Sequence, residues 1–279
     1  MTTAKKVLFI TQEITPYVPE TELSVISRYL PPAIQEKGKE IRTFTPKWGN
    51  VNERRNQLHE VIRLSGMNLI IDDTDNPLII KVASIQSARM QVYFIDNDDF
   101  FQGRLMTADA AGVEYEDNDL RTIFFARGVL ETVKKLRWCP DIVHCHGWMT
   151  ALAPLYIKKA YKDEPSFRNS KVIFSVYDNG FKQVFRPDFA AKLQVKGVAK
   201  KDITCLKKPV SYYNLMRVAI DYSDGIIQQS AQVDEDVMQY ARQQGKPILE
   251  YLEPETFYAT CNDFYDRIWE AGQEKEPTS

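Results

Sequence analysis

Two histidines separated by one residue, His144 and His146, have the side-chain type and spacing best suited to chemistry in this sequence. They follow the short apolar run Ile142-Val143, which is typical of a buried parallel strand. If that strand continues to His146, both imidazoles lie on one face, because side chains alternate along a strand. A zinc site needs more ligands, but the only other histidine, His59, lies in a distant polar segment. We therefore predict no metal site.

The residues after this strand predict a site at the edge of a sheet. Gly147 and Trp148 form a corner before a helix expected over Met149–Tyr161. Open α/β sheets bind ligands at the carboxyl ends of their strands, where such corners lie. Trp148 either stacks on a sugar there or packs in the core. Other strand-end residues are candidate ligand contacts or simple turn residues: Tyr177, Asp178, Tyr93 and Asp96.

Alternating strands and helices predict the fold class. The expected strands are Val7–Ile10, Ile41–Phe44, Val92–Ile95, Ile142–His144, Val172–Val176 and Gly225–Gln228. The expected helices between them are Ser24–Lys37, Asp119–Arg137, Met149–Tyr161, Tyr212–Tyr222 and Gln232–Gln243. This rhythm predicts an α/β fold, a single Rossmann-like lobe with a mostly parallel, doubly wound sheet. Arg121 and Arg127 are expected to be structural ion-pair partners.

The domain organisation follows from the same pattern. We expect one domain over residues 1–254, with an antiparallel hairpin inserted at about 58–88, formed by Val61–Leu64 and Leu78–Ile85. Residues 255–272 are expected to form an amphipathic helix that packs back on this domain. Residues 273–279 are expected to be a disordered tail.

Composition limits the function classes. The 279 residues carry a formal charge of −2 with acids and bases intermixed, so we expect no nucleic-acid and no membrane partner. No apolar run reaches transmembrane length. The four cysteines lack paired spacing and no signal peptide is present, which predicts free thiols and a cytoplasmic location.

Several segments together resemble bacterial glycogen synthases and plant starch synthases. His144, His146, Trp148 and Leu152 match the family's His-x-His-Asp-Trp-x-x-x-Leu segment. Further matches, in the same order, are Gln12-Glu13-Ile14-Thr15-Pro16-Tyr17, Tyr93-Phe94-Ile95-Asp96-Asn97, Asp117–Arg127 and Tyr213–Asp224. The resemblance implies the N-terminal lobe of the two-lobed GT-B architecture and transfer of glucose from ADP-glucose or UDP-glucose to an α-1,4-glucan. It gives His146 a catalytic-site position and implies no cofactor beyond the nucleotide-sugar donor.

Departures from the family qualify that expectation. The family's Lys-x-Gly-Gly-Leu loop, in which glycine amides approach a diphosphate, reads here Pro19-Glu20-Thr21-Glu22-Leu23. Gly147 replaces the family's Asp, and its Thr-x-His-Asn segment reads Ser175-Val176-Tyr177-Asp178. Because the sequence leaves the family pattern after Tyr240 and stops at Ser279, we expect the second lobe to be missing.

These departures predict a domain that is catalytically incomplete alone. The alternative is a non-catalytic protein of storage-polysaccharide metabolism that binds glucan or a partner. A third reading pairs the chain with a separate second-lobe protein. We expect the sheet edge around His146, Trp148, Tyr177 and Asp178 to be exposed and partly apolar, and to bind an α-glucan, a protein partner or a second copy of the chain.

Overall fold

The computed structural model describes residues 4–206 and 209–273. Its strands are β1 (Lys6–Thr11), β2 (Glu40–Pro46), β3 (His59–Glu60), β4 (Met67–Ile71), β5 (Thr74–Ile85), β6 (Met90–Asp96), β7 (Ile142–His146), β8 (Lys171–Val176), β9 (Gly225–Gln228) and β10 (Ile248–Leu249). Its α-helices are α1 (Glu22–Glu36), α2 (Asp98–Phe101), α3 (Asn118–Lys135), α4 (Leu152–Lys159), α5 (Phe189–Lys192), α6 (Tyr212–Asp221), α7 (Glu235–Gln243) and α8 (Pro254–Gln273). Short 3-10 turns lie at Gln86–Ala88, Trp148–Thr150 and Lys200–Ile203.

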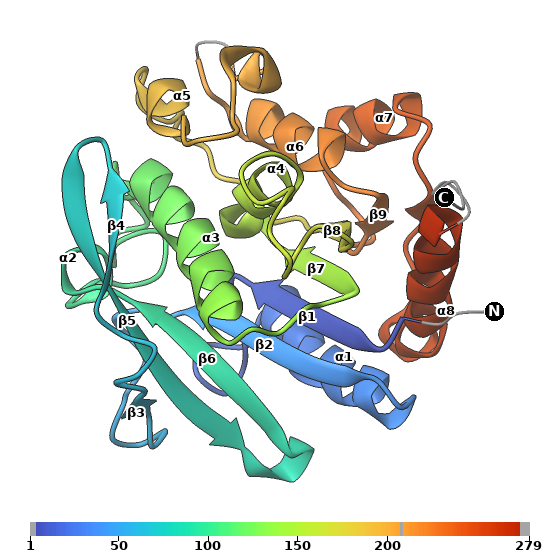
Figure 1. The fold of residues 1–279 in the computed structure, drawn as a ribbon, viewed down its shortest axis with the longest axis horizontal. Coiled ribbons are helices and arrows are strands. Elements are labelled where there is room, and N and C mark those ends of the chain that lie inside the picture. The colour runs from blue at the N-terminus through green and yellow to red at the C-terminus, as the bar shows by residue number, and fades with distance from the viewer. Residues whose placement is uncertain (1–3, 207–208, 274–279) are drawn as a thin grey trace.

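One sheet organises these elements, with the strand order β10-β9-β8-β7-β1-β2-β6-β5-β3 (Figure 1). The pairs from β10 to β6 are all parallel, whereas β5 pairs antiparallel with β6, β3 and β4. The predicted α/β class with a mostly parallel sheet is confirmed. The chain moves from β1 to β2 on one side of β1, while β7, β8 and β9 follow on its other side. The strand order therefore reverses between β1 and β7, which is where sheets of this kind form a ligand crevice.

The two faces of the sheet are covered by different helices. Along β1, Val7 and Phe9 belong to a buried cluster with residues of α1 and α8. Leu8 and Ile10 belong instead to the larger cluster with residues of α3, α4, α6 and α7. Side chains thus alternate between the two faces with a period of two, as expected for a strand that is buried on both faces. Because helices cover both faces, the sheet is doubly wound.

The antiparallel part differs in detail from the predicted hairpin. β5 contains the predicted strand Leu78–Ile85 but begins earlier, at Thr74, and pairs with β4 around the turn residues Asp72 and Asp73. The predicted strand Val61–Leu64 is wrong, because this segment forms a turn in which the Leu64 amide donates to the Val61 carbonyl. Short-range turn hydrogen bonds thus prevail over the apolar pattern of that segment.

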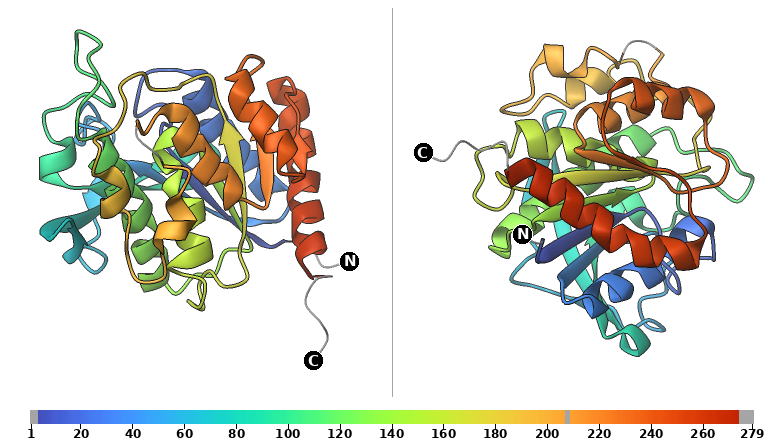
Figure 2. Two further views of the ribbon diagram at one scale, coloured as in Figure 1. Left: turned by 90° about the horizontal axis from the view of Figure 1, so that it is seen from above. Right: turned by 90° about the vertical axis from the view of Figure 1, so that its right-hand side faces the viewer.

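Helix α8 lies beside α1, on the face of the sheet opposite α3 (Figure 2). Phe257, Phe264 and Ile268 are buried there. Gly225 at the start of β9 permits the close approach, since a Cβ at this position would lie 3.0 Å from Ile268 Cδ1. Gln273, which was expected in the disordered tail, is the last residue of α8; the rest of that predicted tail lies outside the described residues.

Candidate functional site

The crevice between β1 and β7 is filled by the protein's own side chains. The Gln12 amide donates to the His146 carbonyl at 3.1 Å, which extends the pairing of the two strands. The Gln12 side chain is buried, and its Oε1 accepts a hydrogen bond from the Met149 amide at 3.1 Å. Trp48 Nε1 donates to the Gln12 carbonyl at 2.7 Å. Residue 12 therefore occupies the space that a ligand would enter at this point of the sheet.

Gly147, where the resemblance expects Asp, is part of this closure. Its φ is +83°, and a Cβ at this position would lie 2.6 Å from Leu23 Cδ1 and 2.9 Å from Gln12 Oε1. Neither the backbone conformation nor the free space accepts a larger residue. The polar atom next to this turn is supplied by Gln12, so the Gln12 side chain fits the space that the glycine at position 147 leaves.

The N-terminus of α1, which follows the departing loop, is capped by its own residues. Thr21 Oγ1 accepts from the Ser24 amide at 3.0 Å, and Ser24 Oγ accepts from the Thr21 amide at 2.8 Å. This reciprocal pair is a capping box, and it satisfies two of the amides that a helix N-terminus otherwise offers to an anion, those of Thr21 and Ser24. Pro19 contributes its carbonyl to Ser24 Oγ at 3.2 Å. The loop is thus fixed by internal hydrogen bonds.

Three carboxylates surround this N-terminus. Glu20 and Glu22 are exposed, while Glu13 is buried and accepts from Thr21 Oγ1 at 2.6 Å. Burial raises the pKa of Glu13, and the hydrogen bonds from Thr21 and Gln12 oppose that shift. Glu22 accepts a hydrogen bond from Ser230 Oγ, which connects α1 to the end of β9. The local charge is negative wherever these groups are ionised.

His144 and His146 share one face of β7, as predicted, with ring centroids 3.8 Å apart. Both are fully buried. His144 Nε2 contacts Ser175 Oγ at 2.7 Å, and Ser175 Oγ donates to Gln229 Oε1 at 3.3 Å. The Ser175 hydroxyl proton is therefore used, so His144 carries its proton on Nε2 and accepts at Nδ1 from the Tyr265 hydroxyl at 2.6 Å. This chain of hydrogen bonds ties α8 to three strands.

His146 is only half satisfied. Its Nδ1 lies 2.8 Å from the Tyr177 hydroxyl, whereas its Nε2 is buried and has no hydrogen-bond partner among the described residues. Burial lowers the pKa of His146 to about 3 and that of His144 well below its usual value, so both rings are neutral near pH 7. Burial also raises the pKa of Tyr177 well above its usual value. The site residue expected from the family position is therefore enclosed.

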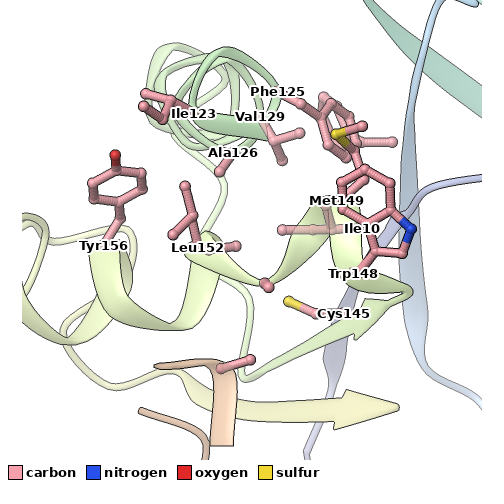
Figure 3. Close-up of a cluster of buried hydrophobic side chains, with 14 of the residues drawn as sticks. Ile10, Ile123, Phe125, Ala126, Val129, Cys145, Trp148, Met149, Leu152 and Tyr156 are labelled. Carbon is pink, nitrogen blue, oxygen red and sulfur yellow. The ribbon is translucent and has the colours of Figure 1, made fainter. Parts of the chain in front are cut away.

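Trp148 is a core residue. It is 3% exposed and contacts the Phe181 ring edge-on at a centroid distance of 4.8 Å. Figure 3 shows it in the buried cluster together with Met149, Ile10 of β1 and Phe125 of α3. Of the two readings of Trp148, the structure favours packing over a sugar platform.

An open groove remains beside the closed crevice, at the carboxyl ends of β8 and β9. Its volume is about 460 Å³, and its lining includes Tyr177, Asp178, Phe181, Tyr212 and Asp234. Asp178 is exposed, and its amide donates to Ser230 Oγ at 3.0 Å. The carboxylate acceptors and aromatic residues in this lining suit a ligand rich in hydroxyl donors.

Tyr93 and Asp96 do not join this groove. Tyr93 lies in the middle of β6, where it stacks on Phe44 at 4.8 Å and its hydroxyl accepts from Arg42 Nη1 at 3.2 Å. Asp96 ends β6 but is buried and forms an ion pair with Lys81 at 2.8 Å. Both residues lie within β6 and have structural contacts, so they match neither the ligand-contact reading nor the turn reading.

The two arginines of α3 also differ from expectation. Among the described residues Arg121 forms no ion pair; its guanidinium is fully buried, 4.9 Å from the centroid of the Trp48 ring and 5.2 Å from that of Phe101. Arg127 donates to the Ile70 carbonyl at 2.5 Å. Both side chains are structural, but through rings and a carbonyl rather than through carboxylates.

The expected exposed apolar edge is not where the sequence placed it. His146, Trp148 and Tyr177 are buried, and only Asp178 of the four is exposed. Exposed apolar side chains lie instead on neighbouring loops, at Leu105, Val113 and Val184. In the described part of the chain no three His, Cys, Asp or Glu side chains are grouped to hold a metal ion.

Two residues that the sequence analysis did not select could have been found by the strand-end argument. Gln12 follows β1 and Ser230 follows β9, so both are strand-end residues at the same edge as Tyr177. Applying the strand-end argument to every predicted strand would have selected them. Tyr212 and Asp234 precede or begin helices, and only their spatial position marks them.

The reversed strand order, the helices on both faces and the His-x-His edge define a Rossmann-like lobe of the kind found in GT-B glycosyltransferases. The model of the starch synthase catalytic domain matches residues 6–251. The glycogen synthase of Pelodictyon phaeoclathratiforme is 30% identical over 274 residues, covering 97% of this chain and 55% of that protein. The glycogen synthase of Chlorobium chlorochromatii is 37% identical over 183 residues, covering 64% of this chain and 36% of that protein.

A solved structure agrees in fold. The catalytic domain of starch synthase IV from Arabidopsis thaliana, bound to ADP and acarbose, matches with a TM-score of 0.71 and 17% identity, over 90% of this chain and 52% of that one. The protein therefore belongs to the starch synthase catalytic domain family, as a glycogen/starch synthase-like glycosyltransferase domain. The chain spans about half the length of the curated relatives it matches. None of the helices in the described ranges is long and apolar enough to cross a membrane.

Proposed function

We propose that this chain recognises an α-glucan at the carboxyl edge of its sheet and does not, by itself, transfer glucose from ADP-glucose or UDP-glucose. The observation that carries the proposal is the closed N-terminus of α1. The amides of Thr21 and Ser24 are already paired with each other's hydroxyl groups. Glu13, Glu20 and Glu22 surround them.

Electrostatics makes this loop unfavourable for a diphosphate. A carboxylate about 4 Å from a phosphate oxygen costs about 4 kcal/mol at an effective dielectric of about 20. Salt screens this repulsion at the exposed Glu20 and Glu22, but much less at the buried Glu13 when it is ionised. Transfer also requires stabilisation of the leaving diphosphate, and the Thr21 and Ser24 amides of this loop are already engaged.

The open groove supports the glucan part of the proposal. Asp178 and Asp234 accept hydrogen bonds only, and a glucan supplies hydroxyl donors. Phe181 and Tyr212 add apolar ring surface to the lining. The family uses a nucleotide-sugar donor, while the nucleotide, a protein partner or homodimer, and the cytoplasmic location remain predictions. The four cysteines are free thiols, in keeping with the last of these.

Calorimetry on the purified chain tests the binding part of the proposal, and incorporation of labelled glucose tests the transfer part. We expect heat of binding with maltoheptaose, no measurable binding of ADP or UDP at millimolar concentration, and no incorporation of labelled glucose into glycogen from either donor. Glu22→Gln removes the charge and keeps an acceptor for Ser230, so it is the matched control for repulsion. If Glu22→Gln binds ADP more tightly than the wild type, the removed charge accounts for the difference. Turnover by the wild-type chain at a rate typical of enzymes would refute the proposal.

A further inference from the structure

Part of the open groove is lined by residues of a segment that is neither helix nor strand, residues 178–184, which we call the groove segment. Gly180 and Phe181 of this segment belong to the lining. Gly180 has no side chain, so it contributes only its backbone, and a Cβ there would lie 3.2 Å from Tyr212 Cδ1. The shape of the groove at this point therefore depends on how the backbone of the segment is held.

Two backbone hydrogen bonds fix the ends of the groove segment. Its first amide donates to Ser230 Oγ at 3.0 Å. Directly after the segment, the Phe185 amide donates to the Val210 carbonyl at 3.0 Å. Between these two points, in the part of the chain that the structure describes, the amides of residues 179–184 have no acceptor other than Glu114. The backbone in the middle of the segment is thus held by one side chain.

Glu114 accepts hydrogen bonds from two successive amides. Its Oε1 and Oε2 accept from the Lys182 amide at 2.9 and 3.1 Å, and its Oε2 also accepts from the Gln183 amide at 2.7 Å. Hydrogen bonds to an ionised carboxylate are shorter and about twice as strong as those between neutral groups. One carboxylate therefore connects the groove segment to a loop that precedes it by more than sixty residues.

The loop that carries Glu114 is itself held by polar contacts. Asn118, at the start of α3, donates from Nδ2 to the Thr107 carbonyl at 2.7 Å. Arg104 and Asp117 form an ion pair at 2.6 Å. These contacts tie both arms of the loop to each other and to a long helix, so the carboxylate is presented from a fixed base.

We propose that Glu114 is a positioning residue of the groove: by binding the Lys182 and Gln183 amides, its carboxylate holds the backbone of Gly180 and Phe181 in the conformation that receives the sugar. Glu114 is not one of the residues that line the groove, so it acts through the segment that it holds. Without this carboxylate, the segment would have to be ordered when the ligand binds, which lowers affinity. The inference rests on the proposed function, since it takes the groove ligand to be a glucan.

Hydrogen exchange and calorimetry on the full chain test the inference. In Glu114→Ala, the Lys182 and Gln183 amides should exchange about tenfold faster than in the wild type, because their acceptor is gone. Affinity for maltoheptaose, measured well below the melting temperature, should fall by about threefold to tenfold. Glu114→Gln keeps an oxygen acceptor and should restore most of the affinity, which a role of the charge alone would not allow.

Two further variants complete the design. Glu116→Ala removes the same charge from the same loop; Glu116 is exposed, does not line the groove, and should change neither measurement. If Glu114→Ala does not fold, as judged by circular dichroism, Glu114→Asp replaces it. This variant keeps the charge but is one methylene shorter, so it should also show faster exchange and weaker binding.

The outcomes separate this inference from the proposed function. If the wild type binds maltoheptaose, equal affinity or equal exchange in the folded Glu114 variant overturns the inference alone. An equal loss of affinity in Glu116→Ala also overturns it, because the net charge of the loop would then explain the effect. If the wild type binds no maltoheptaose, the glucan proposal fails, and the positioning role fails with it.

Discussion

At the scale of single residues, the pair Gln12 and Gly147 explains why the edge is closed. Gly147 has a positive φ, and its missing side chain leaves room for Leu23 and for Gln12 Oε1. Gln12 uses that room to accept from the Met149 amide. A side chain at 147 would compete for the same volume, so the glycine at 147 and the position of the Gln12 side chain depend on each other.

Gly147 combines an unusual backbone conformation with close neighbours. Its φ of 83° and ψ of 160° lie in a region that is essentially open to glycine alone, and a Cβ would also overlap Leu23. Gly245 has φ +65° and no atom within 4 Å of a built Cβ, so Gly245→Ala measures the cost of a positive φ without overlap. In urea unfolding, Gly147→Ala should lose more stability than Gly245→Ala by at least about 1 kcal/mol, because its backbone region and the overlap are both unfavourable. Equal losses would show that the backbone at Gly147 and its neighbours Leu23 and Gln12 adjust freely.

The buried histidines predict an acid-sensitive fold. Burial depresses the folded-state pKa of both rings below about 6.5, the unfolded value. The unfolded chain then binds more protons, so their stability is present above about pH 6.5 and is lost as pH falls, by about 1.4 kcal/mol per pH unit for each ring. Glu13 and Asp96, whose pKa values are raised by burial, act in the opposite direction.

Urea unfolding at about pH 7 and 5 measures this loss, in the range where histidine titrates. His146→Gln should remove about half of the histidine contribution. His59→Gln is the matched control, because His59 is exposed and should leave the pH dependence unchanged. An unchanged pH dependence in His146→Gln would exclude a buried neutral imidazole at this position.

At the scale of elements, α8 depends on one buried hydrogen bond as well as on apolar packing. Tyr265 donates to His144 Nδ1 at 2.6 Å, and both residues are fully buried. Tyr265→Phe leaves Nδ1 unpaired, which should cost about 1–3 kcal/mol. Tyr258→Phe, on the half-buried side of the same helix, should cost little. Urea unfolding and limited proteolysis of α8 compare the two variants. Equal stability of both variants would show that the Tyr265 hydroxyl contributes nothing to the packing of α8.

Most elements were predictable because their signals are local. Gly225–Gln228 is identical in prediction and structure, and β1, β2, β6 and β8 each extend the predicted strand by one or two residues at an end. The predicted Met149–Tyr161 helix instead begins as a 3-10 turn and becomes α4 only at Leu152. The turn arises from the Gly147 carbonyl accepting from the Thr150 amide. Hydrogen bonds that depend on such a corner are not visible in apolar periodicity.

At the scale of the whole molecule, the sequence located the site edge but not its solvent exposure. The face shared by His144 and His146 followed from alternation along one strand. The burial of Trp148 involves the ring of Phe181, which is distant in sequence from the strand that carries the histidines. Exposure is decided by packing between such segments, so a strand-end rule predicts the place of a residue but not whether a ligand reaches it.

The last prediction separates stability from binding across the edge. Trp148→Ala removes a 3% exposed side chain and should cost about 3–5 kcal/mol of stability. Its glucan affinity, measured below its lowered melting temperature, should equal that of the wild type, because Trp148 is not one of the residues that line the groove.

Asp178→Asn and Asp234→Asn should behave in the opposite way. Replacing a charge-assisted hydrogen bond to a sugar hydroxyl by a neutral one should cost about 1 kcal/mol, or about fivefold in affinity. Asn still caps helix N-termini, so Asp234→Asn should keep the contact to the Val237 amide that begins α7 and barely change the melting temperature. Weaker glucan binding in Trp148→Ala with unchanged binding in both Asp variants would move the ligand site away from the groove and back to the tryptophan.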